Sequence, residues 1–393
     1  MAKYIYHYDN WTNFVWNENE IRDLFGEVKY LQGKLNGIVS TIGFSQKEET
    51  LLKTLTFDIL KSSEIEGELL NYDQVRSSIA RRLGIETAGL VPSARNIEGI
   101  VEMMLDATQH YEKPLTEERL FGWHNALFPS GYSGAHKIDV ACYRKDEIQV
   151  VSGVMGQEKV FYEAVPQALV KAEMDKFLHW LNIDFSIDNM LKAAIAHFWF
   201  IIIHPFDDGN GRIARTITDM QLARAEKSLQ RFYSLSSQIL VEKQKYYEAL
   251  QKVQWRSDSD ITEWLTFFLN CMKNALLSSE QAISHVLHKA EFWAQHEYTP
   301  INERQRLMLN KLFDSDFVGK LQSSKWAKCC KCSQDTAIRD INDLIEKGIL
   351  KQQEGGGRNT NYMLMETQKP ACPKPAASST QAKKPGGQSN KKV

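Results

Sequence analysis

One stretch constrains this chain more than any other, a strongly apolar segment that ends in a glycine-rich turn. Residues 193–203 are predominantly apolar, which predicts a helix buried on all sides. The chain then reads His-Pro-Phe-Asp-Asp-Gly-Asn-Gly-Arg-Ile-Ala-Arg over residues 204–215. Glycine on both sides of an asparagine predicts a tight turn, and we expect helix to resume at Arg212.

The turn formed by Gly209, Asn210 and Gly211 is typical of an anion site. Its successive backbone N–H groups are left unpaired and point the same way, and the following helix adds partial positive charge at its N-terminus. Arg212 and Arg215 are three residues apart and therefore share one face of that helix. Their forked guanidinium groups suit terminal phosphates, so the pattern predicts a polyphosphate site.

Two further residues beside the turn bring chemistry to it. Asp208 offers a hard oxygen ligand of the kind that Mg²⁺ takes together with phosphate oxygens. His204 titrates near neutrality and can accept a proton from an attacking hydroxyl. We therefore expect transfer of a phosphorus-containing group to a hydroxyl. An ordinary helix–turn–helix corner with a capping histidine is the alternative, but it does not explain why all these residues occur together.

The run over residues 204–215 resembles the Fic-family motif, His-x-Phe-x-(Asp/Glu)-Gly-Asn-Gly-Arg-x-x-Arg, with every defined position filled. The resemblance implies an all-α Fic fold with a small β-hairpin flap. It also implies an enzyme that moves AMP from ATP to a Ser, Thr or Tyr hydroxyl of a target protein or of itself. ATP and Mg²⁺ would be required, with His204 as general base and Asp208 as the magnesium ligand. The phosphate contacts would come from the other motif residues, Gly209, Asn210, Gly211, Arg212 and Arg215.

An upstream segment, Ser-Ser-Glu-Ile-Glu-Gly over residues 62–67, points to regulation. It resembles the family's inhibitory pattern, (Ser/Thr)-x-x-x-Glu-(Gly/Asn), in one register, Ser62, Glu66 and Gly67. A carboxylate at Glu66 against Arg215 would occupy the γ-phosphate position, so that ATP binds in an unproductive pose. In some relatives the same glutamate helps to remove AMP from a modified target, so a removal-dominated enzyme stays open. A solvated surface helix is the alternative.

Between the two motifs, residues 148–151 and 160–162 predict two short strands around a glycine turn. The resemblance implies that this hairpin is the flap, which pairs with the main chain of a target and aligns its hydroxyl. The residues expected to dock the target are Val150, Val151, Ser152 and Gly153. A plain surface hairpin is the alternative.

A tyrosine-containing helix follows the motif over residues 245–254 and looks like the family helix that lines the adenine pocket. Tyr247 would pack on or near the base. Gln254, seven residues on, would hydrogen-bond the base from the same face, at a place where the family often has Asn. Ordinary amphipathic packing is the alternative. Other donors, such as UTP or a phosphocholine conjugate, stay open because only these residues distinguish them.

The length and composition support two or three domains, since 43% of the 393 residues are hydrophobic. We expect an N-terminal helical module with the inhibitory helix over residues 1–90 and the Fic core with trailing helices over 91–300. The chain order of three helices and two strands predicts a winged helix-turn-helix over 301–366. Residues 367–393, rich in Lys, Pro, Ala, Ser and Gly, predict a disordered tail.

The charge pattern bears on partners and location. Net charge is −1, so no global basic field favours nucleic acid. The third helix of the C-terminal module carries Asp335, Asp340, Asp343 and Glu346 against Arg339 and Lys347, which disfavours DNA. Protein contact or homodimerisation is favoured, and a winged-helix regulator with a nucleotide-sensing core is the alternative. We find no membrane span or signal-peptide pattern, and expect a cytoplasmic protein.

Overall fold

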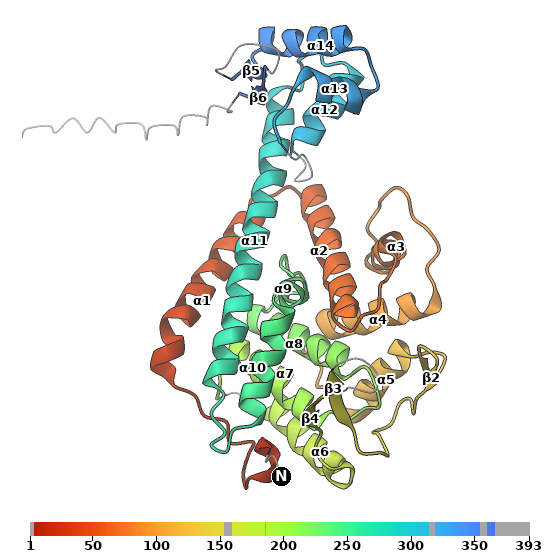
Figure 1. Ribbon diagram of the computed structural model, residues 1–393, viewed down its shortest axis with the longest axis vertical. Coiled ribbons are helices and arrows are strands. Elements are labelled where there is room, and N and C mark those ends of the chain that lie inside the picture. The colour runs from red at the N-terminus through yellow and green to blue at the C-terminus, as the bar shows by residue number, and fades with distance from the viewer. Residues whose placement is uncertain (1–3, 153–158, 185, 314–318, 354–359, 366–393) are drawn as a thin grey trace, which may run out of the picture. The chain divides into compact units, whose positions relative to one another are not determined.

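The computed structural model describes residues 4–152, 159–184, 186–313, 319–353 and 360–365 (Figure 1). The chain divides into two compact units, Met1–Leu287 and His288–Val393. Predicted segments 1–90 and 91–300 lie largely within the first of these units. The two segments pack together because α2 (Phe44–Ile65) lies against α8 (Asn210–Glu226) and α9 (Leu235–Val241).

The first unit opens with helices that carry the upstream motif of residues 62–67. After a short 3₁₀ helix, Ile5–His7, it contains α1 (Glu18–Ser40), α2 (Phe44–Ile65) and α3 (Tyr72–Leu83). The Asn17 side chain caps α1 by accepting a hydrogen bond from the Asn19 N–H at 3.1 Å. Its apolar face is buried at Ile21, Val28, Leu31 and Leu35, which recur at helical spacing.

The remaining helices of the first unit include the apolar helix that precedes the glycine turn. They are α4 (Arg95–Gln109), α5 (Glu117–Leu127), α6 (Gln167–Ile183), α7 (Asn189–Ile203), α8 (Asn210–Glu226), α9 (Leu235–Val241), α10 (Lys243–Gln254) and α11 (Thr262–Gln295), whose last residues enter the second unit. Every residue of α7 from Met190 to Ile203 is buried, because its neighbours cover all its faces. In the described part of the chain, no helix combines the length and apolar character required to cross a membrane.

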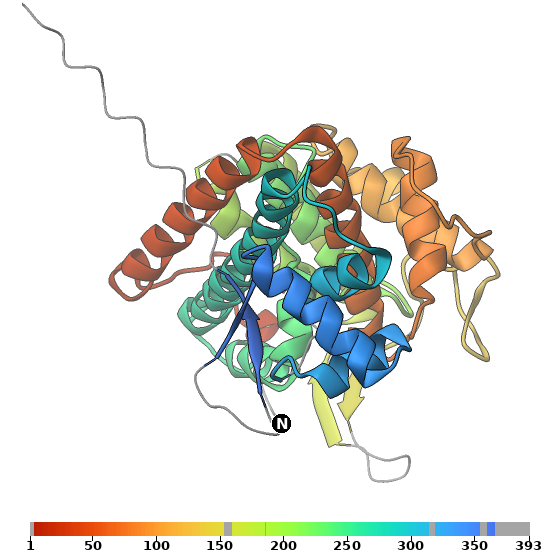
Figure 2. The same cartoon turned by 90° about the horizontal axis from the view of Figure 1, so that it is seen from above.

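Two small hairpins join the helices of the first unit. Strands β3 (Gln149–Ser152) and β4 (Lys159–Glu163) are antiparallel, with Gln149 opposite Glu163. They match the predicted strand pair within two residues at each end, and Figure 2 shows them (yellow) extending beyond the helices around them. Gly153 lies outside the described residues. The shorter pair, β1 (Tyr132–Ser133) and β2 (His136–Lys137), was not predicted, because two-residue strands carry no hydrophobic alternation.

The second unit has its own core. It contains α12 (Glu303–Phe313), α13 (Ser323–Cys330), α14 (Gln334–Glu346), and the antiparallel strands β5 (Leu350–Gln352) and β6 (Tyr362–Leu364). Ser333 caps α14 by accepting a hydrogen bond from the Thr336 N–H at 3.2 Å. Trp326, Ile341 and Leu344 are fully buried. The order of three helices followed by two strands agrees with the sequence expectation for this segment.

A glycine at the α4–α5 contact provides a test of this packing. A Cβ atom on Gly99 would lie 1.8 Å from the Ala126 carbonyl oxygen, a backbone atom of α5 that cannot rotate away. We expect Gly99→Ala to lower the free energy of unfolding by about 2–3 kcal/mol, because overpacking forces the two helices apart. Urea unfolding followed by circular dichroism measures the effect.

The matched control is Gly33→Ala on α1, where an added Cβ meets no atom within 4 Å. That change should raise stability by roughly 0.5–1 kcal/mol, since alanine favours helix over glycine. A Gly99→Ala protein as stable as the parent would contradict the close approach of α4 and α5.

Candidate active site

The backbone at His204 is turned sharply where α7 ends. His204 adopts φ 50° and ψ 59°, a left-handed conformation that stops the helix, and its N–H still donates to the Phe200 carbonyl at 3.0 Å. The buried Arg144 fixes this turn: its Nε donates to the His204 carbonyl at 2.8 Å, and its backbone N–H donates to the Pro205 carbonyl at 2.9 Å. Arg144 therefore stabilises the turn that carries His204 through these two hydrogen bonds.

The half-buried His204 imidazole is set up as a proton acceptor. Its Nδ1 lies 3.3 Å from the Ile201 carbonyl, an oxygen that can only accept, so Nδ1 carries the proton. Nε2 is then left unprotonated. Burial lowers the pKa of His204 to about 4, which keeps the ring neutral at pH 7. A neutral imidazole with a free Nε2 is the form that a general base requires.

The glycine turn leads directly into the N-terminus of α8. Gly209 has φ 83°, and a Cβ atom there would lie 2.7 Å from Leu127 Cδ2 and 2.8 Å from Phe128 Cε2. Only glycine fits both the backbone conformation and the space. Helix resumes at Asn210, two residues earlier than predicted, because the left-handed Gly209 itself is the N-cap. It provides no side-chain cap, so the first N–H groups of α8 remain available to an anion.

Asn210 is buried, and its side chain closes the turn. Its Oδ1 accepts from the Phe206 N–H at 3.0 Å and its Nδ2 donates to the Phe206 carbonyl at 2.7 Å. Both polar atoms of the amide are therefore used within the protein. The bond to the Phe206 carbonyl uses only one of the two protons on Nδ2, so Asn210 can offer a phosphate the second proton as well as its backbone N–H.

The carboxylate of Asp208 lies at the same helix end. Its Oδ1 accepts from the Gly209 N–H at 2.5 Å and lies 3.8 Å from Arg212 Nη2, while its Oδ2 accepts from the Ser133 hydroxyl. Among the residues that the structure describes, no group of three or more His, Cys, Asp or Glu side chains could hold a metal ion. One partly exposed carboxylate beside a turn with free backbone N–H groups fits the way Mg²⁺ binds, with substrate phosphates as its other ligands.

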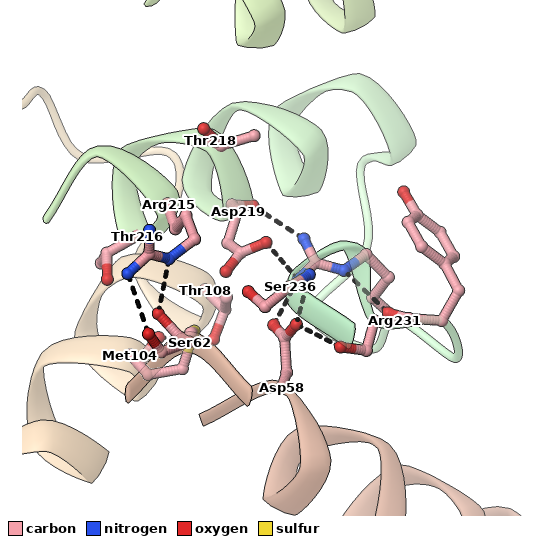
Figure 3. A network of polar contacts seen from close by, with 12 residues as sticks. Asp58, Ser62, Met104, Thr108, Arg215, Thr216, Thr218, Asp219, Arg231 and Ser236 are labelled. Atoms are coloured by element: carbon pink, nitrogen blue, oxygen red, sulfur yellow. Dashed lines mark hydrogen bonds and ion pairs between the residues drawn. The ribbon is translucent and has the colours of Figure 1, made fainter. Parts of the chain in front are cut away.

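The end of α2 engages Arg215 through its Nε and Nη2, while the buried Nη1 has no partner among the described residues. Its Nε donates to the Ser62 hydroxyl at 2.8 Å, and its Nη2 donates to the Ser62 carbonyl at 2.9 Å and to Glu66 Oε1 at 2.7 Å. Figure 3 shows the bonds to Ser62. The Glu66 carboxylate also covers Gly211, where an added Cβ would lie 2.1 Å from its Oε1. Gly67, at φ 85°, then turns the chain away from the helix. The structure thus brings Ser62 and Glu66 of the upstream motif to Arg215, and Gly67 forms the turn that follows them.

Arg212 has a partner that the sequence did not suggest. Its Nη1 lies 2.6 Å from Glu68 Oε2, and its guanidinium lies over the Phe128 ring, 5.0 Å from the centroid. Glu68 stands just outside the upstream motif. The only signal in the sequence was a second acid two residues after Glu66, which is too common on surfaces to be diagnostic.

A buried ionic cluster joins α2 to α8 one helical turn before Ser62 in the sequence of α2. Asp58 on α2 and Asp219 on α8 both contact Arg231 Nη2, with the Asp58 oxygen at 3.1 Å (Figure 3). Asp58 also accepts from the Ser234 hydroxyl at 2.6 Å and from the Ser236 N–H at 3.3 Å. Two buried carboxyl groups that share one arginine tie α2 to α8 at this position. Sequence reasoning missed this cluster because its members are far apart in the chain.

A cavity of about 310 Å³ lies between the glycine turn and α10. Half-buried Tyr247 and buried Gln254 line it from α10, opposite His204 and Gly211. Residues from the base of the β3–β4 hairpin also line it, as does Glu66. The full lining is Glu66, Ile148, Gln149, Tyr162, Ile201, His204, Asp207, Asp208, Asn210, Gly211, Tyr246, Tyr247, Leu250 and Gln254.

Comparison with known proteins agrees with this geometry. The Fic/DOC family profile matches residues 114–222, and a profile described as a domain of unknown function (DUF4172) matches residues 4–85. The curated "Protein adenylyltransferase Fic" of Culex quinquefasciatus is 32% identical over 129 residues, which are 32% of this chain and 23% of that protein. The protein of the same name from Aedes aegypti is 32% identical over 127 residues, 31% of this chain and 23% of that protein.

Among solved structures, a Fic family protein from Desulfovibrio desulfuricans superposes with a TM-score of 0.50. The alignment covers 89% of this chain and 97% of that one at 19% identity, so it supports the fold alone. The curated relatives are matched over less than a quarter of their own length. The segment that matches the Fic/DOC family profile, residues 114–222, is the one that holds His204 and the glycine turn.

Proposed function

We propose that this chain is an autoinhibited protein adenylyltransferase, which moves AMP from ATP to a Ser, Thr or Tyr hydroxyl of a target protein. The observation that carries the proposal is the shared 310 Å³ cavity, lined by His204, Asp208, the start of α8 and the tyrosine of α10. The Fic relatives named as protein adenylyltransferases support the choice of reaction.

The residues of the site divide the reaction between them. The base of ATP would pack beside Tyr247 and Gln254, with the α-phosphate at the N–H groups that begin α8. His204 Nε2 takes the proton of the target hydroxyl as its oxygen attacks the α-phosphorus. The new O–P bond forms as the bond to the bridging oxygen breaks, and pyrophosphate leaves. When bound beside Asp208, Mg²⁺ would supply charge neutralisation on the phosphates.

The terminal phosphates are the natural ligands of the two arginines. Freed from α2, Arg215 would hold the γ-phosphate through its planar fork of donors, and Arg212 would stabilise the leaving pyrophosphate. In this structure Ser62 and Glu66 instead accept hydrogen bonds from Nε and Nη2 of Arg215. The resting chain is therefore inhibited through competition between a carboxylate and a phosphate for the same guanidinium.

The target would dock on the β3–β4 hairpin. An extended segment can pair with the edge of a two-stranded sheet through main-chain hydrogen bonds, which tolerates many target side chains. The docking residues in this proposal are Val150, Val151, Ser152 and Gly153. The neighbouring Ile148 and Gln149 line the nucleotide cavity, so a paired segment would lie beside the α-phosphate.

Removal of AMP from a modified target is a second candidate. The Glu66 carboxylate lines the same cavity as His204 and covers Gly211, where it can act on a water molecule. If removal dominates, Glu66→Gly should abolish AMP release from a pre-modified target. Unchanged release in that variant would exclude this role of Glu66.

For the second unit we propose a winged helix that contacts protein. Two acids of α14 are already paired: Asp340 with Arg304 Nε at 2.9 Å and Asp343 with Lys347 at 2.5 Å. Their charges are thus balanced within the unit and leave no strong basic surface on this helix for DNA.

Transfer of label from α-labelled ATP in the presence of Mg²⁺ tests the proposed activity. Glu66→Gly should raise protein labelling at least about tenfold, because a charged hydrogen bond worth roughly 1.5–3 kcal/mol becomes available to the γ-phosphate. Adding His204→Ala should lower it by about 10²–10⁴-fold, the usual contribution of a general base. The control is Glu64→Gly, whose carboxylate pairs with Lys61 at 2.7 Å, away from the arginines. Labelling that rises equally in the control would attribute activation to a loosened α2.

The pH dependence of transfer tests the protonation state of His204. Since burial holds the pKa of His204 at about 4, the base is already neutral well below its ordinary pKa of roughly 6.5. For the Glu66→Gly variant, kcat/KM should stay flat as pH falls from about 8 to about 5.5 and decline only near the pKa in the free enzyme. An acid limb with its midpoint near 6.5 would contradict the buried, neutral imidazole.

Folding needs a separate check over that range. The depressed pKa means that the unfolded chain binds protons more readily than the folded one, so stability falls as pH drops from about 6.5 towards 4. Circular dichroism at each pH identifies the range in which the protein remains folded.

A further inference from the structure

We infer that Glu68 is a second blocking carboxylate, and that Glu66 and Glu68 together make the resting site select nucleoside monophosphates over di- and triphosphates. The inference rests on the proposed nucleotide site. It assigns the chemical class of ligand that the resting chain binds, and it gives a role to a residue outside the upstream motif.

The contact itself is close and directed. Glu68 Oε2 lies 2.6 Å from Arg212 Nη1, and the Arg212 side chain is only 8% exposed. The opposite edge of the guanidinium faces Asp208, with Nη2 at 3.8 Å, and its flat face lies over Phe128. A phosphate that approaches Arg212 must therefore displace Glu68.

The turn after α2 holds Glu68 in this place. Gly67 adopts φ 85°, and the Glu68 N–H donates to the Ser63 carbonyl at 3.0 Å. The reversed chain brings Glu66 and Glu68 to the same side of the turn, one for each arginine. Glu64, two residues before Glu66, pairs instead with Lys61 on α2. Position in the turn, and not acidity alone, selects the two blocking residues.

Two neighbouring cavities lie along the proposed path of the phosphates, and they differ in which carboxylates line them. Glu66 and Asp208 line both the 310 Å³ nucleoside cavity and a second cavity of about 720 Å³. Glu68 and Arg212 line only the second. A nucleotide with its base beside Tyr247 places its first phosphate at the start of α8, and further phosphates must pass Glu66 into the larger cavity. There they meet Arg212 already neutralised by Glu68.

Charge adds to this competition. Glu66, Glu68 and Asp208 present three carboxylates along the path of the phosphates. Each added phosphate brings more negative charge towards them and can reach an arginine only by breaking an ion pair. Glu68 is 36% exposed, so its pair with Arg212 is screened and can be broken at modest cost. The predicted selectivity is accordingly a graded preference for AMP over ADP and ATP.

Calorimetric titration of the full chain with AMP, ADP and ATP tests the inference without requiring catalysis. The parent should bind AMP at least about tenfold more tightly than ADP, a difference of about 1.4 kcal/mol. Glu68→Gln should tighten ADP and ATP binding by roughly three- to tenfold and leave AMP within twofold, since only the distal phosphates meet Arg212. Glu68→Ala repeats the test with no acceptor left on the side chain.

Glu64→Gln is the matched control, because it removes the same charge two residues before Glu66 and should reproduce the parent's order of affinities. ADP binding as tightly as AMP in the parent, or unchanged ADP affinity in both Glu68 variants, would overturn the inference. Absence of AMP binding in every variant would overturn the proposed nucleotide site itself. The two failures are therefore distinguishable. Titrations with and without Mg²⁺ should give the same order, since the blocked donors belong to the protein.

Discussion

The contact between α2 and Arg215 is the interaction on which the resting state of this site depends. A buried guanidinium must be paired, since an unpaired buried charge is strongly destabilising. Ser62 on α2 and Glu66 directly after it satisfy Nε and Nη2, and Nη1 is left without a partner among the described residues. In the proposed mechanism a γ-phosphate competes with Ser62 and Glu66 for these donors. On that proposal, folding and inhibition rely on the same hydrogen bonds within one chain.

The ionic cluster behind this contact determines where α2 can lie. Asp58, Asp219 and Arg231 are all nearly inaccessible to solvent, and burial raises the pKa of Asp219 well above its ordinary range. Since Arg231 lies between the two carboxyl groups, its removal would leave both of them buried without their cation. This arrangement makes a sliding displacement of the whole helix costly. Under the proposed autoinhibition, activation would require movement only of the short segment after Ser62 that bears Glu66 and Glu68, and the cluster would stay intact.

Much of the site could be predicted from the sequence because its parts are local. The apolar α7, the glycine turn and the arginines of α8 lie within one short run, so helical periodicity and turn chemistry place them together. Pairing of Glu66 with Arg215 joins residues 149 positions apart and was reached only through the family resemblance. Glu68, Ser133 and the Asp58 cluster were missed because their partners are set by tertiary packing. The side chain of Asn210 holds the Phe206 backbone here, a detail that spacing alone does not reveal.

The central claim is that Glu66 and the γ-phosphate compete for Arg215. Crystal structures of the parent and of Glu66→Gly, each with a non-hydrolysable ATP analogue, test it most directly. The account predicts that the γ-phosphate contacts Arg215 in the variant, while in the parent Glu66 retains the arginine and the phosphates are displaced. A γ-phosphate on Arg215 in the parent, with the Glu66 contact still intact, would contradict it.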